Sequence, residues 1–199
     1  MKHRLVHDVS SLPDHGFDAQ SPMWWGTIGF IATESAAFVA AIAAYFYLMF
    51  LSPDWPMSDG PPALGPGTLS LAVLLLSLWP NHLISKRAKE HDKKGCQRLL
   101  VLMSLIGFVP IAIRVFEFQA LGLRWDENAY GSIVWVILGL HTLHLLTDVG
   151  DTLVLTALMF TRHGHGKRFS DVADNAFYWD FVVGSWVVLY LVIYWAPRL

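Results

Sequence analysis

Four ionisable side chains in one apolar stretch of this sequence follow a regular spacing. His141, His144, Asp148 and Asp151 are separated by steps of three, four and three residues. An α-helix turns once in about 3.6 residues, so this spacing places all four side chains in one stripe of one helix. Imidazole and carboxylate groups spaced in this way can contribute ligands to a metal site shared with a second helix. A stripe of this kind cannot face lipid, and it predicts a polar surface that other parts of the protein cover.

A single acid, Glu34, interrupts the uncharged stretch between Trp24 and Phe50. At a rise of about 1.5 Å per residue it lies about 15 Å along a helix from Trp24, near the middle of a hydrocarbon core about 30 Å thick. His141 and His144 reach similar depths on their own helix. A carboxyl group needs a partner there in either protonation state, so we expect Glu34 to join these histidines in a buried polar network. It either fixes helix packing or handles a proton, and the sequence leaves both roles open.

Arg114 and Glu117 lie three residues apart in another apolar segment. One helical face would carry both side chains, so they can form an ion pair, and we place Glu117 in the buried polar network. Arg114 is alternatively a candidate for lipid binding, because a guanidinium group matches the geometry of a phospholipid phosphate. Asp180 lies about one turn inside the last apolar segment, where it can reach water. We group it with Asp148 and Asp151 as acids of the cytoplasmic half.

Metal and haem sites are less favoured by the same residues. A complete metal site needs ligands from a second helix, and Glu34 and Glu117 are the membrane acids that the first three apolar segments offer. A haem with two axial ligands needs them on opposite faces, whereas His141 and His144 project from one side of one helix. The sequence also contains no phosphate-binding glycine loop, hydrolase elbow or zinc-protease motif. We therefore expect no metal, no bound haem and no catalytic residue in this chain.

The composition explains why these groups must be enclosed. Of the 199 residues, 54% are hydrophobic and 14% aromatic, and the mean hydropathy is +0.44, which indicates a membrane protein. A membrane-spanning helix needs about 20 mostly apolar residues. Five segments qualify, at 24–51, 68–84, 99–121, 130–160 and 177–195. The sequence predicts an all-α, polytopic membrane protein, with a five-helix bundle in residues 24–199 and an N-terminal tail in residues 1–23.

The distribution of Lys and Arg predicts the orientation of this bundle. Eleven of the fourteen lie in the tail and in the second and fourth loops, and two lie on the other side. The positive-inside rule then places the N-terminus in the cytoplasm and the C-terminus outside. The tail has no apolar run long enough for a cleavable signal peptide. Eight aromatic residues near the segment ends are expected as interface anchors: Trp24, Trp25, Trp55, Trp125, Tyr130, Trp179, Tyr194 and Trp195.

Two function classes are excluded by simple counts. The formal net charge is −2, which gives no basic surface for nucleic acid. Cys96 is the single cysteine, so the chain can form neither an internal disulfide nor a cysteine-rich metal centre.

Four stretches of the chain carry the patterns of one known family. The segment from Trp24 to Ser35 is similar to a helix with a membrane-embedded glutamate, which falls on Glu34. The segment from Phe116 to Gln119 has a glutamate among aromatic residues, at Glu117.

The other two stretches complete the set. The segment from Tyr130 to His144 is similar to a Gly-Phe-His-Gly-Leu-His pattern, with its histidines at His141 and His144. The segment from Phe177 to Trp186, with the terminal Tyr-Trp pair, is similar to the last helix, although Asp180 stands where a histidine is usual. In order and spacing, the four stretches together resemble subunit III of haem-copper respiratory oxidases, in the five-helix form of some bacteria.

The resemblance implies a non-catalytic accessory subunit that packs on oxidase subunit I in a cytochrome c or quinol oxidase. Haem and copper in the partner subunits would reduce oxygen to water and pump protons, while this chain would bind no cofactor of its own. It would hold structural phospholipids in a cleft and support proton uptake and sustained turnover in the bacterial cytoplasmic membrane. Three alternatives stay open: an accessory subunit of a nitric oxide reductase, an independent proton-coupled transporter, and a His/Asp metalloenzyme.

Overall fold

The computed structural model describes residues 16–57, 60–162 and 164–199, and all the long elements in these ranges are helices. Five are long and apolar enough to cross a membrane: α1 (Pro22–Leu51), α2 (Leu64–Lys89), α3 (Lys93–Ala120), α4 (Ala129–Phe160) and α5 (Lys167–Tyr190). The helix α5 continues through a π-helical turn, Leu191–Trp195, and short 3-10 turns occupy Asp18–Gln20 and Ala196–Arg198. The prediction of an all-α protein with five membrane-spanning helices is confirmed.

The helices start at residues whose side chains can replace the missing backbone partners. Ser21 accepts a hydrogen bond from the backbone N–H of Met23 before α1, and Asp92 accepts one from Gly95 before α3. Asn128 does the same for Gly131 before α4. Each cap satisfies one of the free N–H groups of a first helical turn, so the helix boundaries follow local sequence.

The structure corrects the helix boundaries expected from hydropathy. The helix α5 begins at Lys167, ten residues before the predicted start at Phe177, and α3 begins at Lys93 instead of Leu99. Hydropathy detects the part of a helix that lies in hydrocarbon, whereas a helix can continue into water with polar residues. The early start of α5 matters because its first three turns bring several polar side chains to the bundle.

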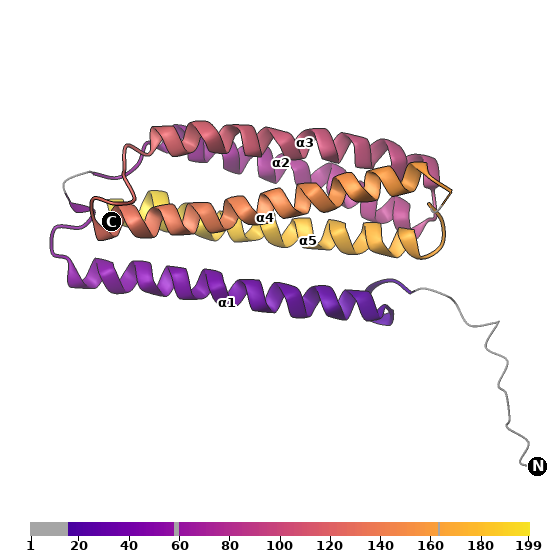
Figure 1. Ribbon diagram of the computed structural model, residues 1–199, viewed down its shortest axis with the longest axis horizontal. Helices are drawn as coiled ribbons and strands as arrows, with labels where there is room; N and C mark the ends of the chain where they lie inside the picture. The colour runs from indigo at the N-terminus through magenta and orange to yellow at the C-terminus, as the bar shows by residue number, and fades with distance from the viewer. Residues whose placement is uncertain (1–15, 58–59, 163) are drawn as a thin grey trace, which may run out of the picture.

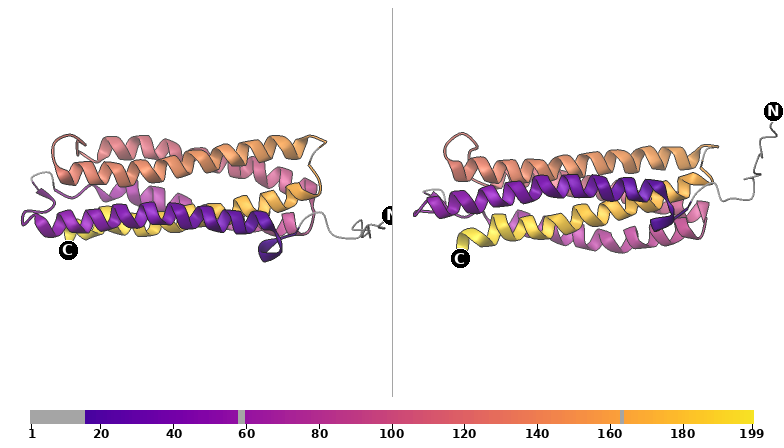
Figure 2. Two further views of the ribbon diagram at one scale, coloured as in Figure 1. Left: turned by 60° about the horizontal axis from the view of Figure 1, so that its bottom comes forward. Right: turned by 90° about the horizontal axis from the view of Figure 1, so that it is seen from below.

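One helix lies apart from the other four. The helices α2, α3, α4 and α5 pack into a bundle, and α1 runs alongside α4 and α5 (Figure 1; Figure 2). Phe38 and Tyr45 are the largest side chains that α1 buries, and Phe38 contacts the rings of His144 and Phe181. Most of the remaining surface of α1 is exposed. Since α1 packs mainly against α4 and α5, it leaves a cleft along one of its sides.

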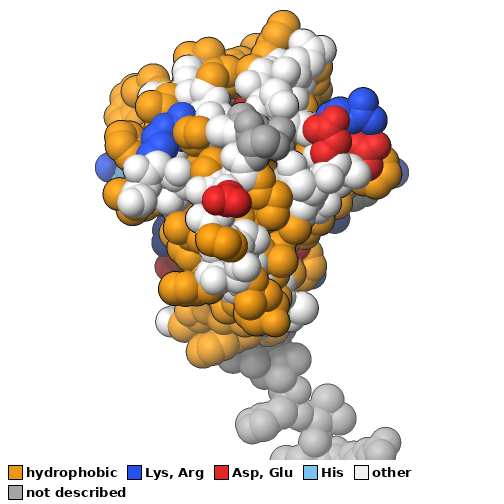
Figure 3. Space-filling view, turned by 90° about the vertical axis from the view of Figure 1, so that its left-hand side faces the viewer, with side chains coloured by type: hydrophobic (Ala, Val, Ile, Leu, Met, Phe, Trp, Pro, Cys, Tyr) orange, Lys and Arg blue, Asp and Glu red, His pale blue; other side chains and the backbone are white. Residues whose placement is uncertain are grey.

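The two ends of the bundle differ in charge. The C-terminus and the α1–α2 and α3–α4 connections lie at one end, where apolar side chains dominate and charged ones form small separate groups (Figure 3). In the α3–α4 connection Arg124 pairs with Asp126 and Glu127, and its hydrogen bond lowers the pKa of the Asp126 carboxyl. The α2–α3 and α4–α5 connections lie at the other end, and the helix ends that flank them carry most of the Lys and Arg.

Several of the expected interface anchors lie in the protein interior instead. Tyr130, Trp179 and Tyr194 are buried, so the prediction is wrong for these three. Trp179 donates a hydrogen bond from Nε1 to Ser77 Oγ at 2.8 Å, which satisfies its polar atom inside the bundle. Trp25, Trp125 and Trp195 are exposed near helix ends, as an anchor must be.

Candidate functional site

Glu34 joins three helices through two partners. The hydroxyl of Tyr178 on α5 donates to Glu34 Oε2 at 2.6 Å, and Nε2 of His144 on α4 lies 3.2 Å from Glu34 Oε1. The two atoms of the second contact are as close as in an ion pair, but they are not aligned for a hydrogen bond. Glu34 therefore gives α1 a polar attachment to both α4 and α5.

The contacts of His144 fix where its protons lie. Its Nδ1 is 2.6 Å from the carbonyl oxygen of Leu140, which can only accept, so Nδ1 carries a hydrogen. A neutral imidazole would then turn the lone pair of Nε2 toward the carboxylate lone pairs of Glu34, which is repulsive. The Glu34 carboxyl and the His144 imidazole are thus close enough to exchange a proton at one end of the cleft.

A second polar group surrounds Arg114. Its NH1 is 2.7 Å from Glu117 Oε2, and its NH2 is 3.0 Å from His141 Nδ1. The hydroxyl of Tyr194 donates to Glu117 Oε1 at 2.5 Å, and the guanidinium carbon lies 4.0 Å from the ring centre of Trp186. Because guanidinium only donates, His141 Nδ1 accepts, and Nε2–H donates to a backbone carbonyl at 3.1 Å. His141 is neutral in this arrangement.

The ion pair expected between Arg114 and Glu117 is present. The lipid contact expected for Arg114 is not supported, because this residue is 1% exposed and its guanidinium is held inside the bundle. A lipid phosphate could reach it only if the helices separated. The structure also divides the expected network of Glu34, Glu117, His141 and His144 into two groups, with one histidine in each.

The three acids assigned to the cytoplasmic half occupy three different environments. Asp148 is 1% exposed, and neither of its carboxyl oxygens has a hydrogen-bond partner among the described residues. Asp151 is exposed and lines the cleft beside α1. Asp180 is exposed on another side of α5, where Asn81 of α2 donates to its Oδ1 at 2.8 Å. These acids therefore do not form one cluster.

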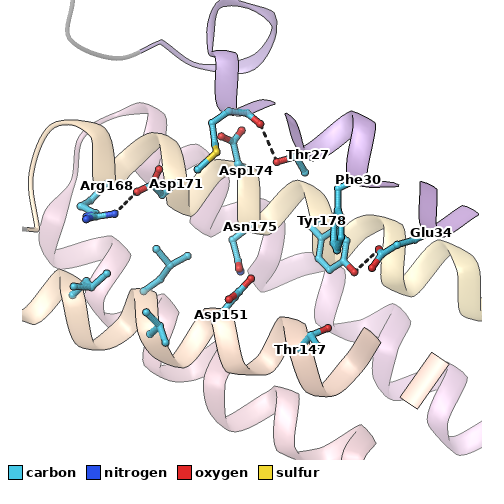
Figure 4. A pocket seen from close by; sticks show the side chains of 14 residues that line it. Thr27, Phe30, Glu34, Thr147, Asp151, Arg168, Asp171, Asp174, Asn175 and Tyr178 are labelled. Atoms are coloured by element: carbon cyan, nitrogen blue, oxygen red, sulfur yellow. Dashed lines mark hydrogen bonds and ion pairs between the residues drawn. The ribbon is translucent and has the colours of Figure 1, made fainter. Parts of the chain in front are cut away.

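A cleft of about 410 Å³ lies between α1, α4 and α5 and connects part of this site to the surface. Glu34 and Tyr178 lie at one end of the cleft, and Arg168 and Asp171 lie at the other (Figure 4). Further lining residues are Met23, Thr27, Phe30, Thr147, Asp151, Val154, Leu155, Leu158, Asp174 and Asn175. Both acidic and apolar side chains line this space, so it can admit water, a polar head group or an alkyl chain.

Several polar residues of the cleft wall were not predicted from the sequence. Asp171 pairs with Arg168 at 2.7 Å, whereas Oδ2 of the buried Asp174 has no hydrogen-bond partner in the described ranges. Asn175 and Asp151 face each other in the middle of the cleft (Figure 4). Asp171, Asp174 and Tyr178 are spaced by three and four residues, which is the signal that could have revealed a helical stripe. The predicted span 177–195 excluded Asp171 and Asp174, so they were not placed on one helix with Tyr178.

No metal centre is formed by the part of the chain that the structure describes. Within residues 16–57, 60–162 and 164–199, no group of three or more His, Cys, Asp or Glu side chains could hold a metal ion. The absence of metal ligation in this chain stays a prediction.

The comparisons with known proteins all indicate one family. Residues 3–197 match a family model described as cytochrome c oxidase subunit III. A relative from Synechocystis sp. is 30% identical over 176 residues, which cover 85% of this chain and 74% of the relative. A relative from Thermostichus vulcanus is 26% identical over 188 residues, covering 93% and 92% of the two chains. One from Petromyzon marinus is 27% identical over 204 residues, covering 96% and 76%.

All three relatives are named cytochrome c oxidase subunit 3. The family model spans nearly the whole chain, and the five helices carry Glu34, Glu117, His141 and His144 in the order that the resemblance required. The chain belongs to the cytochrome c oxidase subunit III family.

Proposed function

We propose that this chain is a non-catalytic accessory subunit of a proton-pumping cytochrome c oxidase and packs on the catalytic subunit I. The observation that carries the proposal is the family match over residues 3–197 of a five-span membrane protein. The partner subunits would hold the haem and copper that reduce oxygen to water. The relatives above are all described as oxidase subunits, so they give no support to the nitric oxide reductase alternative.

Gentle purification from native membranes tests this proposal. We expect the chain to co-elute with larger haem-containing membrane subunits, identified by mass spectrometry, and with oxidase activity. Recovery of the chain alone, with a haem or metal of its own, would contradict the accessory role. Ion flux through the isolated chain in liposomes would favour the transporter alternative.

The proposed location is the bacterial cytoplasmic membrane, with the N-terminus inside and the C-terminus outside. The Lys- and Arg-rich helix ends lie at the end opposite the C-terminus, which supports this orientation. We expect a membrane-impermeant thiol reagent to label Leu199→Cys in intact spheroplasts, and Lys94→Cys only after lysis. Both variants are made with Cys96→Ala, which removes the native thiol. Labelling of Lys94→Cys before lysis would reverse the orientation.

We further propose that the cleft holds phospholipid and water and supports proton uptake by the partner. Its acids lie between the Lys- and Arg-rich end and the Glu34–His144 pair, and a wall of carboxylates raises the local proton concentration. Arg168 at the mouth can contact a phosphate, while the apolar side chains of Phe30 and Val154 can contact an alkyl chain.

Neutralising the cleft acids should therefore slow the enzyme. For the double variant Asp151→Asn and Asp174→Asn we expect a severalfold lower steady-state turnover and a faster decline during sustained turnover. Oxygen consumption by the purified complex measures both. Asp126→Asn, which changes an exposed acid in the α3–α4 connection, is the matched control. If turnover and its decline are unchanged in the double variant, these acids have no role in proton uptake.

A further inference from the structure

A second surface of α5, away from the cleft, exposes a carboxylate within a membrane-spanning helix. The exposed residues of this surface follow at steps of three and four: Phe177, Asp180, Gly184, Val188, Leu191 and Trp195. This spacing places them on one face of the helix, which we call the α5 outer face. Tyr178 and the other cleft residues of α5 point to a different side, so the two surfaces are separate.

The α5 outer face lies between two other helices. In the view from below, α5 is seen between α1 and α2 (Figure 2, right). The ring centre of Trp24 on α1 lies 6.1 Å from that of Phe177. On the other side, Asn81 of α2 donates to Asp180 Oδ1 at 2.8 Å and to the carbonyl oxygen of Ala176 at 2.7 Å. The residues of the α5 outer face stay exposed between these two helices.

Asp180 lies within the membrane-spanning part of α5, closer to its polar end than to its middle. It is fifteen residues from Trp195, or about 22 Å along the helix, inside a hydrocarbon core about 30 Å thick. Asn81 occupies Oδ1, and the described residues offer no hydrogen bond to Oδ2. A carboxyl group exposed to lipid chains is unfavourable, and such groups face protein or water instead. The neighbouring His82 on α2 is also exposed, which extends the polar surface.

The surroundings of Asp180 fit a second helix better than lipid. Gly184 lies one turn further along the same face, and a Cβ atom added to it would meet nothing within 4 Å. The missing side chain lets another backbone approach closely. Val188 and Leu191 on α5 and Leu75 on α2 are exposed apolar residues around this point. A polar group next to a small residue, with apolar residues around both, is typical of contacts between membrane helices.

We propose that the α5 outer face packs against a transmembrane helix of the oxidase's catalytic subunit, which presents a basic or hydrogen-bond-donating side chain to Asp180. The inference rests on the proposed function and adds the face through which this chain joins the complex. Lipid chains carry no donor at this depth. A second copy of this chain, docked through the same face, would bring two Asp180 carboxyl groups together, which is unfavourable.

Site-specific photo-crosslinking in native membranes tests the location. The photoreactive amino acid p-benzoylphenylalanine is placed at Val188, which is 50% exposed on the α5 outer face, and as a control at Leu105, which is 63% exposed on α3. We expect the Val188 position to form a covalent adduct with the largest oxidase subunit, and the Leu105 position to form none. Adducts of Val188 with lipid only, or with a second copy of this chain, would overturn the proposal. So would partner adducts at Leu105 but not at Val188.

Two substitutions test the role of the carboxyl group. We expect Asp180→Leu to raise the fraction of this subunit lost from the complex in detergent about tenfold, because it removes the acceptor of a buried hydrogen bond. Asp180→Asn keeps an acceptor and should cause a smaller loss, while Glu127→Leu, on an exposed loop, should cause none. Retention of Asp180→Leu at the wild-type level would overturn the role of Asp180. If no oxidase subunit co-purifies with the wild-type chain, the proposed function itself fails.

Discussion

Replacing Arg114 by methionine should lower the free energy of unfolding by about 3–5 kcal/mol, because it removes one partner of a fully buried ion pair. Glu117 would keep the hydroxyl of Tyr194 but lose its cation at 2.7 Å. Nδ1 of His141, which accepts from the guanidinium at 3.0 Å, would lose its donor as well. Thermal unfolding of the purified complex, followed by the loss of this subunit, measures the effect.

A pair of matched variants separates the charge from the packing. The double variant Arg114→Met and Glu117→Gln removes both charges, so it should recover a large part of the lost stability. Arg114→Lys keeps the charge but loses the planar guanidinium that contacts Glu117 and His141 at once. Its stability should therefore lie between those of the wild type and Arg114→Met. Wild-type stability of Arg114→Met would show that this ion pair contributes nothing to the bundle.

The sequence predicts this pair well because the two residues are local. Arg114 and Glu117 are one helical turn apart, and in apolar surroundings the nearest opposite charge is the best partner available. Depth along the helix also correctly brings Glu34 to the level of the histidines. Depth cannot choose between His141 and His144, however, because the choice depends on how α1 is rotated about its own axis. The structure selects His144 at 3.2 Å.

Contacts between different helices could not be predicted, because they depend on how each helix is rotated about its own axis. Tyr194 was expected at the membrane interface, yet it reaches Glu117 because α5 continues through the π-helical turn Leu191–Trp195. An extra residue in a turn changes the direction of the side chains that follow, and hydropathy contains no trace of it. Asp180 was grouped with Asp148 by depth alone. Asp180 instead lies on the side of α5 that faces α2, where it accepts a hydrogen bond from Asn81.

Replacing Glu34 gives the second large effect that we expect. Glu34→Ala would leave the hydroxyl of Tyr178 without its acceptor and Nε2 of His144 without its neighbour. An unsatisfied buried polar group costs about 1–3 kcal/mol, and here the loss falls on the contact that holds α1 to the bundle. We expect at least tenfold less of this subunit per haem in the purified oxidase. The ratio is measured by quantitative mass spectrometry with haem absorbance.

Glu34→Gln separates the two roles that remain open for this residue. The amide oxygen can accept from Tyr178, and the amide N–H can donate to the Nε2 lone pair of a neutral His144, so both partners stay satisfied. The subunit should therefore assemble at the wild-type level, but the pair can no longer share a proton. If assembly is normal and turnover falls, Glu34 handles protons. If both are normal, the carboxyl group serves packing alone. Equal assembly of the Ala and Gln variants would contradict the structural role, because only the Ala variant leaves the partners of Glu34 unpaired.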